Sequence, residues 1–316
     1  MKGLCRQWLL PLILLVIVGS GCGMDPDYQP VDFSSKVLIE EPEQSPASRK
    51  TLRVAIAAMI SPRETLSYYN ALIDYIGSKT GYEIQLVQRK TYGEINALFP
   101  KRQIDLAFVC TGPYANGKDS YGFEGLATPI VRGEPYYYSY LIVHKDSTFE
   151  TLSDLKGSVF AYTDPESNTG ALVPNYWLLQ MNETPAFFKN ITFTYSHDNS
   201  ILAVAKGLVD GAAIDGHIWE FYSRYNSFYT DRTRVIKKSQ PFGSPPLVGS
   251  IHLDAQLKTR IRNVVLWMHR NADGKKILDE LLIDKFVPVE EHWYQPVRNL
   301  FFQVALAGKT YAPNQP

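Results

Sequence analysis

Three short apolar runs separated by helical repeats are the feature that most restricts what this chain can fold into. Leu52–Ala57, Tyr82–Gln88 and Ile104–Cys110 have the composition of buried strands. The two segments between them, Leu66–Thr80 and Tyr92–Phe99, carry apolar residues at helical spacing. This strand–helix order predicts a parallel sheet that presents ligand loops at the carboxyl ends of its strands.

The same alternation restarts after about residue 145, which predicts a second α/β unit. The chain is expected to cross to this unit along Tyr136–His144 and to return near Pro241–Pro246. The further elements expected are strands at 158–162, 191–195, 211–215 and 247–253, helices at 171–181 and 199–207, and a mainly helical segment from residue 257 onward.

This pattern divides the folded part of the chain into two α/β lobes. Lobe 1 is expected to comprise residues 51–140 and 245–316, and lobe 2 residues 141–244. A chain of 316 residues is long enough for each lobe to bury a core of its own. Two lobes joined by two crossings are the architecture of a hinged binding protein with a central cleft.

The N-terminal segment indicates export from the cytoplasm. A short positive region precedes the apolar run Leu9–Val18, which is shorter than a membrane-spanning helix. Small residues then precede Cys22, as in a bacterial lipobox, so we expect residues 1–22 to be a lipoprotein signal peptide and Cys22 to be lipidated. The alternative is an ordinary secretory signal with an incidental cysteine. Residues 23–50 are rich in Pro, Ser, Asp and Glu and are expected to form a flexible tether.

Charge and cysteine use argue against several functions. Lys plus Arg number 32 and Asp plus Glu number 32, so no global basic field attracts nucleic acid. Only Cys110 lies beyond the expected signal peptide, so the mature chain cannot form an intramolecular disulfide, and Cys110 is expected at a buried strand end. We find no zinc-type Cys/His spacing, nucleophile elbow, zinc-protease motif or P-loop. We therefore expect no metal, no cofactor and no catalytic residue.

The segment Asp164–Gly170 is the strongest candidate for an anion site. It lies between a predicted strand and a predicted helix, where the first backbone N–H groups are unpaired and the helix dipole adds partial positive charge. Ser167, Asn168 and Thr169 add side-chain donors at the same place. The two carboxylates of the segment would repel an anion unless they point away from it. The alternative interpretation is helix capping alone, because Ser, Thr, Asn and Asp are common caps.

Seven stretches of the chain, taken together, carry a family resemblance. They are Leu52–Ile56, Tyr92, Asp105–Tyr114, Leu152–Gly157, Ser167–Gly170, Ser196–Asp198 and Val209–Ala213. In order and spacing they resemble the phosphate/phosphite/phosphonate-binding proteins of ABC importers, the PhnD-like group. The resemblance covers residues 52 to about 222. It implies a type II periplasmic-binding-protein fold, in which two α/β lobes hold the ligand in a hinged central cleft.

The resemblance also implies a set of ligand-binding residues, because this family holds phosphorus oxygens with a Ser/Thr loop, tyrosine hydroxyls and a histidine. By position these are Ser167, Asn168, Thr169, Tyr92, Tyr114 and His197. Where the chain has Asn168, a hydroxyl residue is common in the family. Members that take aminoalkylphosphonates also use acidic residues for the amine, and one of those positions holds His217 here, with Asp215 nearby. This favours a smaller or differently substituted oxyanion.

Two further cleft candidates come from the residues themselves. Ser61 follows the first predicted strand, where ligand loops are expected. Tyr136–Tyr138 lies on the strand that crosses between the lobes. Because side chains alternate along a strand, Tyr137 and its two neighbours cannot all line the cleft, and the pattern leaves open which of them do.

The expected function is that of a lipid-anchored, extracytoplasmic solute-binding protein. It would capture phosphate, phosphite or an alkylphosphonate by closing its lobes and deliver the anion to an ABC permease, acting as a monomer. Two alternatives stay open. One is an accessory lipoprotein that reports its ligand to a membrane receptor or kinase. The other is a binder of a different small anion, because a fold does not determine its ligand.

Overall fold

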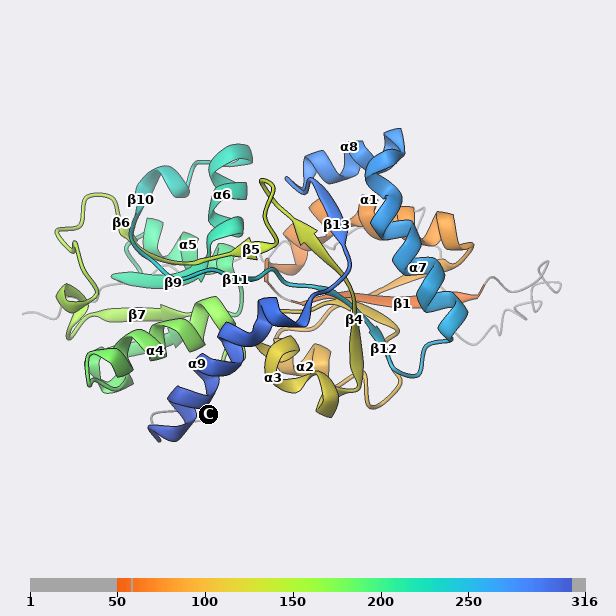
Figure 1. Cartoon of the computed structure of the whole chain (residues 1–316). Helices are drawn as coiled ribbons and strands as arrows, with labels where there is room; N and C mark the ends of the chain where they lie inside the picture. The colour runs from red at the N-terminus through yellow and green to blue at the C-terminus, as the bar shows by residue number, and fades with distance from the viewer. Residues whose placement is uncertain (1–49, 58, 309–316) are drawn as a thin grey trace, which may run out of the picture. The chain divides into compact units, whose positions relative to one another are not determined.

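The computed structural model describes residues 50–57 and 59–308. Two mixed β-sheets flanked by helices form the framework of this part (Figure 1). We call the half built on the six-stranded sheet lobe 1 and the half built on the five-stranded sheet lobe 2. The expected signal peptide, Cys22 and all of the expected tether except Lys50 lie outside the described residues. Within the described residues, no helix is both long enough and apolar enough to cross a membrane.

The sheet of lobe 1 has the strand order β13-β4-β12-β3-β1-β2. Its strands are β1 (Thr51–Ile56), β2 (Glu83–Val87), β3 (Leu106–Phe108), β4 (Phe123–Ile130), β12 (Leu247–Ser250) and β13 (Lys285–Val287). β1 pairs in parallel with β2 and β3, as the strand–helix order predicts. β12 lies antiparallel to β3 and β4, and β13 lies antiparallel to β4. The carboxyl ends of β1 and β3 therefore lie side by side at one edge of the sheet.

The sheet of lobe 2 has the strand order β10-β6-β9-β7-β8. Its strands are β6 (Ser139–His144), β7 (Val159–Tyr162), β8 (Asn190–Phe193), β9 (Gly211–Asp215) and β10 (Thr233–Lys238). β7 pairs in parallel with β8 and β9, whereas β6 and β10 are antiparallel additions. The segments that follow β7 and β9 therefore leave the sheet at the same edge.

Both crossings between the lobes pass through a two-stranded ribbon. It consists of β5 (Tyr136–Tyr137) and β11 (Phe242–Gly243), which pair antiparallel with Tyr137 opposite Phe242. The single crossing strand expected at Tyr136–His144 is thus divided into β5 and β6. This division places Tyr137 between the lobes rather than inside either sheet.

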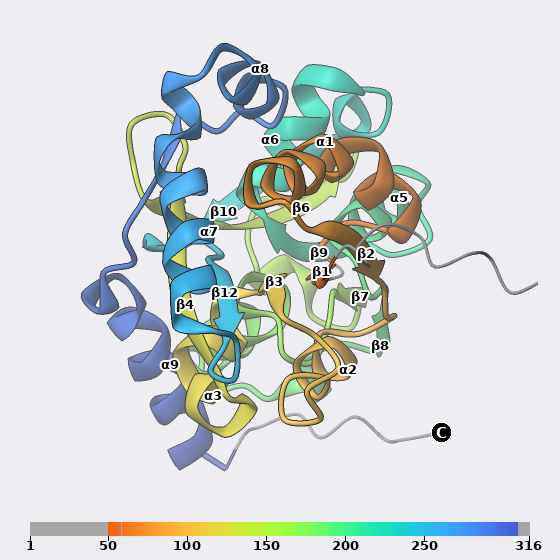
Figure 2. The same cartoon turned by 90° about the vertical axis from the view of Figure 1, so that its right-hand side faces the viewer.

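Helices cover both faces of each sheet. In lobe 1, α1 and α7 pack on the face that carries Phe108, and α2 and α3 pack on the face that carries Ala107 (Figure 2). In lobe 2, α4 covers the face with Phe160 and α5 covers the face with Ala161. The C-terminal α9 packs against α3 of lobe 1 and α4 of lobe 2. The α-helices are α1 (Pro62–Thr80), α2 (Tyr92–Asn96), α3 (Thr111–Tyr121), α4 (Val173–Gln180), α5 (His197–Ala205), α6 (Gly216–Tyr225), α7 (Ala255–Trp267), α8 (Ala272–Glu280) and α9 (Gln295–Leu306).

Single helical turns complete these connections. They are η1 (Ser153–Leu155), η2 (Asn168–Leu172), η3 (Pro185–Phe187), η4 (Thr230–Arg232), η5 (Met268–Arg270) and η6 (Glu291–Tyr294). η2 is a π-helical turn that runs directly into α4, so the helix of lobe 2 that matters for the anion site begins at Asn168. π-turns of this kind occur frequently at functional sites.

Several elements of the structure are not predicted by the sequence pattern, among them α3, β4, α6 and β10. Residues 111–121 form α3 and residues 123–130 form β4, although no element is expected there. The segment of α3 contains two glycines and a proline and has low helix propensity, so its helix depends on packing against lobe 1. As a consequence β3 ends at Phe108, and Cys110 is the N-cap of α3 rather than the last residue of a strand. Cys110 is buried, as expected.

Candidate ligand-binding site

Two helix N-termini, one from each lobe, face each other between the sheets. In lobe 1, α3 begins after its N-cap Cys110, and in lobe 2 the η2–α4 helix begins after its N-cap Ser167. The two ends approach so closely that a Cβ on Gly112 would lie 2.4 Å from the carbonyl oxygen of Glu166. The backbone N–H groups of Gly112 and Asn168 both act on the Cys110 thiol, whose pKa burial raises to about 12 and these two groups lower. The partial positive charge of both helices is therefore directed at one place.

The Ser167–Thr169 loop presents two buried polar atoms that have no partner within the described part of the chain. They are Thr169 Oγ1 and Asn168 Oδ1. Ser167 Oγ accepts a hydrogen bond from Gly170 N at 3.0 Å, so this residue caps the helix. Asn168 Nδ2 donates to the hydroxyl of Tyr137 at 3.1 Å. A buried polar atom without a partner costs free energy, and it is a place where a ligand can bond.

His197 faces the same space as a neutral donor. Its Nδ1 accepts a hydrogen bond from the backbone N–H of Asp215 at 3.1 Å and lies 3.1 Å from Thr163 Oγ1. Because Nδ1 is the acceptor, the proton of the neutral imidazole lies on Nε2, which is 3.4 Å from the hydroxyl of Tyr92. Burial lowers the pKa of His197 to about 3, so the imidazole is neutral at neutral pH.

Two tyrosine hydroxyls complete this group. Tyr92, at the start of α2, and Tyr137, in the crossing ribbon, are both fully buried. Burial raises the pKa of each phenol well above its usual range, so both hydroxyls keep their protons. We call Tyr92, Tyr137, Asn168, Thr169 and His197 the donor cluster, because their hydroxyl, amide and imidazole groups can all hydrogen-bond to an anion.

The carboxylates of Asp164 and Glu166 accept hydrogen bonds from lobe 1. Asp164 Oδ2 accepts from the backbone N–H of Tyr92 at 3.1 Å, in the first turn of α2. Glu166 accepts from Asn96 Nδ2 at 2.9 Å and from the hydroxyl of Tyr121 at 2.8 Å. Burial raises the pKa of Asp164 to about 6. The two acidic groups therefore link the lobes, and their oxygens are paired with protein donors.

Asp215 and Ser61 lie at the edge of the donor cluster. Asp215 caps α6, since its Oδ1 accepts from the backbone N–H groups of His217 and Ile218. Burial raises the pKa of Asp215 to about 7. The backbone N–H of Ser61 donates to Asp198 Oδ1 of lobe 2 at 2.9 Å. The backbone of Ser61 thus links the two lobes, and its hydroxyl makes no cap bond to α1.

Tyr114 does not join the donor cluster. It lies in the first turn of α3, and its hydroxyl donates to Glu291 Oε1 at 2.8 Å. Its ring packs against Tyr294, with ring centroids 4.5 Å apart, and stacks on Phe123. The sequence places Tyr114 at the carboxyl end of a strand, where a ligand residue is expected. The unpredicted helix α3 instead turns the side chain back into lobe 1.

Comparison with known proteins identifies the family. The model of a family described as "ABC transporter, phosphonate, periplasmic substrate-binding protein" matches residues 54–294. The chain belongs to this family. Phosphonates-binding periplasmic protein from Escherichia coli (strain K12) is 24% identical to it over 273 residues, which cover 85% of this chain and 80% of that protein.

Solved structures show the same fold. The binding protein component of an ABC phosphonate transporter from Pseudomonas aeruginosa superposes with a TM-score of 0.77 at 25% identity, covering 85% of this chain and 91% of that one. PhnD1 from Prochlorococcus marinus (MIT 9301), in complex with methylphosphonate, superposes with a TM-score of 0.73 at 18% identity, covering 81% of this chain and 98% of that one. The predicted family and the predicted type II periplasmic-binding fold are therefore confirmed. The chain is an extracytoplasmic substrate-binding protein of an ABC transporter and not an enzyme.

Sequence reasoning missed two members of this site and left a third undecided. Tyr137 was one of three candidates on its strand, and the structure buries it fully while Tyr136 and Tyr138 remain partly exposed. Strand alternation correctly separated Tyr137 from its neighbours, but it could not show which set faces inward. No sequence pattern indicated that Cys110 and Gly112 lie at the site, because their position depends on the unpredicted helix α3.

Within the described residues, no group of three or more His, Cys, Asp or Glu side chains could hold a metal ion.

Proposed function

We propose that this protein captures a phosphorus oxyanion, such as a phosphonate, phosphite or phosphate, in the donor cluster and delivers it to an ABC importer. The observation that carries the proposal is the pair of unpartnered buried atoms, Thr169 Oγ1 and Asn168 Oδ1, at two opposed helix N-termini. The surrounding donors are neutral hydroxyls and a neutral imidazole. Helix N-termini with neutral donors can hold an oxyanion without a Lys or Arg side chain.

Asn168 suits an oxyanion in either orientation of its amide. As placed, its Nδ2 donates to Tyr137 and its Oδ1 can accept from the P–OH of a monoprotonated ligand. With oxygen and nitrogen exchanged, Oδ1 would accept from Tyr137 and Nδ2 would donate to a P–O oxygen. Sulfate has no proton at neutral pH and can use only the second arrangement. The residue that departs from the family pattern is therefore compatible with a phosphorus ligand.

Binding would follow from closure of the lobes on the anion. The described lobes already meet through bonds such as His197 N to Met59 O at 2.9 Å and Ser61 N to Asp198 Oδ1 at 2.9 Å. Tyr92 belongs to lobe 1 and Asn168, Thr169 and His197 to lobe 2, so an anion held by both sets binds the closed form better than the open form. This differential affinity shifts the population toward closure, which the permease can then recognise.

A thermal-shift panel on residues 50–308, freed of phosphate, tests the proposal. The panel holds phosphate, phosphite, methylphosphonate, 2-aminoethylphosphonate and sulfate. A ligand at one hundred times its dissociation constant adds about 2.7 kcal/mol of stability. This corresponds to a rise of about 5–10 °C in Tm for a body of this size. We expect a rise with at least one phosphorus anion and a smaller rise with sulfate, which can use only one arrangement of the Asn168 amide. A folded, ligand-free protein that responds to none of the phosphorus anions would contradict the proposal.

We further propose that the mature protein is a monomer anchored to the membrane through lipid on Cys22. The support is the lipobox-like sequence before Cys22 and the Pro- and Ser-rich segment 23–50 that follows it. Cys22→Ser in the full chain is expected to release the protein from the membrane fraction, because the acylated residue is lost, and to leave ligand affinity unchanged. Retention in the membrane fraction would argue for a different anchor. Light scattering on the released protein tests the monomer.

A further inference from the structure

A cavity lies between the lobes, and two of its lining residues bond to His197 of the donor cluster. Its volume is about 630 Å³, and it is lined by residues of both lobes. Its inner end is formed by buried residues, namely Met59, Phe108, Asp215 and Pro245. Its outer end is formed by exposed residues of α6 and α8 and of the turn between β4 and β5. The cavity therefore runs from the buried site toward solvent.

Two inner residues of this cavity contact the donor cluster itself. Met59 O accepts the backbone N–H of His197 at 2.9 Å. The backbone N–H of Asp215 donates to Nδ1 of the same histidine at 3.1 Å. The inner end of the cavity is therefore separated from the donor cluster only by His197 and the two residues that bond to it. The cavity exists although the lobes are in contact, so closure does not eliminate it.

The walls of the cavity are largely apolar and aromatic. Tyr68 of lobe 1 meets Phe221 of lobe 2 edge to face, with ring centroids 4.7 Å apart. Tyr69, Phe108 and Trp219 add further rings. Aromatic walls of this kind stabilise an apolar or aromatic group by burial and by ring stacking. An apolar cavity of about 150 Å³ is enough to hold benzene, so this cavity has about four times the volume that one aromatic ring needs.

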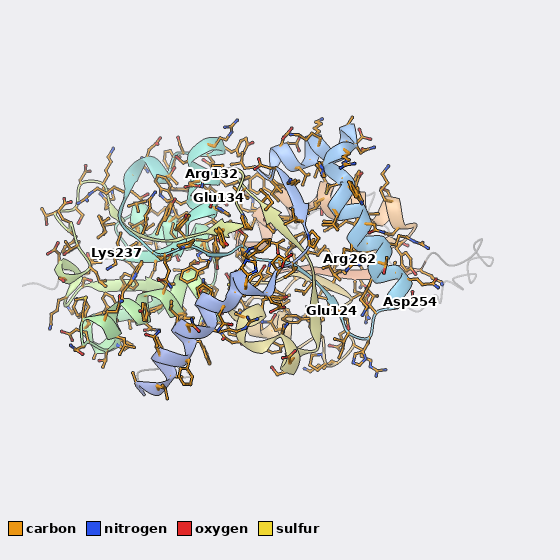
Figure 3. All side chains as sticks on the ribbon, in the orientation of Figure 1. Glu124, Arg132, Glu134, Lys237, Asp254 and Arg262 are labelled. Carbon is orange, nitrogen blue, oxygen red and sulfur yellow. The ribbon has the colours of Figure 1, made fainter. Side chains whose placement is uncertain are left out.

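The charged groups at the outer end are engaged with protein partners. Arg132, on the turn labelled in Figure 3, forms an ion pair with Glu220 of α6. Asp284 accepts the backbone N–H of Gly133 at 2.7 Å. Asp279 forms an ion pair with Lys275. These carboxylates are therefore satisfied within the protein, and they offer little to the ammonium group of an aminoalkyl ligand.

His217 lines the same cavity and does not supply a charge. Its side chain is half-buried, and its pKa is lowered to about 4, mainly by burial, so it is neutral at neutral pH. A neutral imidazole can stack on an aromatic ring or bond to a hydroxyl, but it cannot pair with an ammonium group. The carboxyl group of Asp215 at the inner end caps α6 through its Oδ1, and the remaining lining is mainly apolar. We infer from this that the cavity favours a neutral substituent.

We propose that the cavity holds the organic substituent of the ligand, and that this ligand is a phosphonate or phosphate monoester with a bulky, largely apolar group such as an aryl ring. The inference rests on the proposed function, because it needs the phosphorus oxyanion in the donor cluster. It extends that function by naming the class of substituent. A methyl group would leave nearly all of the cavity filled with water.

Calorimetry on the unmodified protein tests this directly with four probes: inorganic phosphate, methylphosphonate, phenylphosphonate and phenyl phosphate. We expect at least one phenyl ligand to bind about tenfold or more tightly than methylphosphonate, because burial of the ring adds to the contacts of the oxyanion. The stronger of the two phenyl ligands shows whether the ligand is a phosphonate or an ester. Equal or weaker binding of both phenyl ligands, with methylphosphonate bound, overturns this inference and leaves the proposed function standing. Binding of none of the four overturns this inference and restricts the proposed function to phosphite, which the thermal-shift panel tests.

A variant that fills the cavity tests whether the phenyl group of the ligand binds there. Ile218→Trp places a large ring in the cavity wall, whereas the matched control Leu208→Trp places the same ring at a site that is 69% exposed in lobe 2. Ile218→Trp is expected to weaken the preferred phenyl ligand about tenfold and to change methylphosphonate less than twofold. An unchanged phenyl affinity in a folded Ile218→Trp protein would place the ring elsewhere and overturn the assignment. Because the unmodified protein already decides the main point, a failure of this variant to fold leaves the first test intact.

Discussion

Gly112→Ala is expected to weaken ligand binding by about tenfold to a hundredfold. The added Cβ would lie 2.4 Å from the carbonyl oxygen of Glu166 and 3.2 Å from the backbone nitrogen of Asn168. Both are backbone atoms of the opposite lobe, so no side chain can rotate to relieve the contact. The lobes must separate, and overpacking of this kind costs about 1–3 kcal/mol. Since each 1.4 kcal/mol is a factor of ten, this penalty on the closed form reduces affinity to the stated extent.

Calorimetric titration of the ligand found in the panel measures the effect. Gly249→Ala is the matched control, because its Cβ would meet only the side chain of Leu126, at 3.1 Å, within lobe 1. The control is expected to retain the affinity of the unmodified protein even if its Tm changes. An unaltered affinity in Gly112→Ala would mean that the ligand binds without the lobe contact described above.

Thr169→Val is expected to have the second largest effect. Valine has nearly the shape of threonine, so the change removes the hydroxyl and little else. In the ligand-free protein Thr169 Oγ1 has no partner among the described residues, so its loss should not destabilise the fold. In the complex the change would remove a donor to the oxyanion and leave a ligand oxygen unpaired. The expected loss of affinity is about 1–3 kcal/mol, measured by titration, with an unchanged or slightly higher Tm for the ligand-free protein.

Tyr114→Phe is the control that separates the site seen in the structure from the one expected from the sequence. It also removes a single hydroxyl, but that hydroxyl bonds Glu291 at 2.8 Å and not the donor cluster. We expect a change in affinity of less than about threefold and a lower Tm, because Glu291 loses one bond. A large loss of affinity in Tyr114→Phe, with none in Thr169→Val, would place the ligand on the other side of α3.

Much of the fold could be predicted because the relevant signals are local. The three parallel strands of lobe 1 follow from apolar runs of strand length separated by helical repeats. The crossings near 136 and 241 follow from the interruption and restart of that pattern. α1 begins at Pro62, earlier than its apolar spacing suggests, because proline is well suited to the first turn, and it ends at Gly81 in the left-handed conformation. The first and last residues of a helix thus depend on its capping residues rather than on the spacing of its apolar residues.

α3 is an element that local sequence patterns do not predict. Its sequence has little helical preference, so its existence depends on packing against β4, which follows it directly, and against α9, which lies far along the chain. The bond of the Tyr114 hydroxyl to Glu291 follows from this one element. The placement of Tyr137 depends on the same kind of information, because alternation along a strand defines two faces and only packing decides which one is buried.

The sequence alone determined the family, the two-lobe fold and the loop Ser167–Thr169. Each of these depends on residues that lie close together, or in a fixed order, along the chain. Only the tertiary structure showed that Asp164 and Glu166 bond to lobe 1, that the Tyr114 hydroxyl bonds Glu291, and that Tyr137 bonds Asn168 of this loop. The physical reason is that the site lies between lobes. Its donors come from segments separated by as many as 105 residues, as for Tyr92 and His197. The directions of these side chains depend on how the lobes pack.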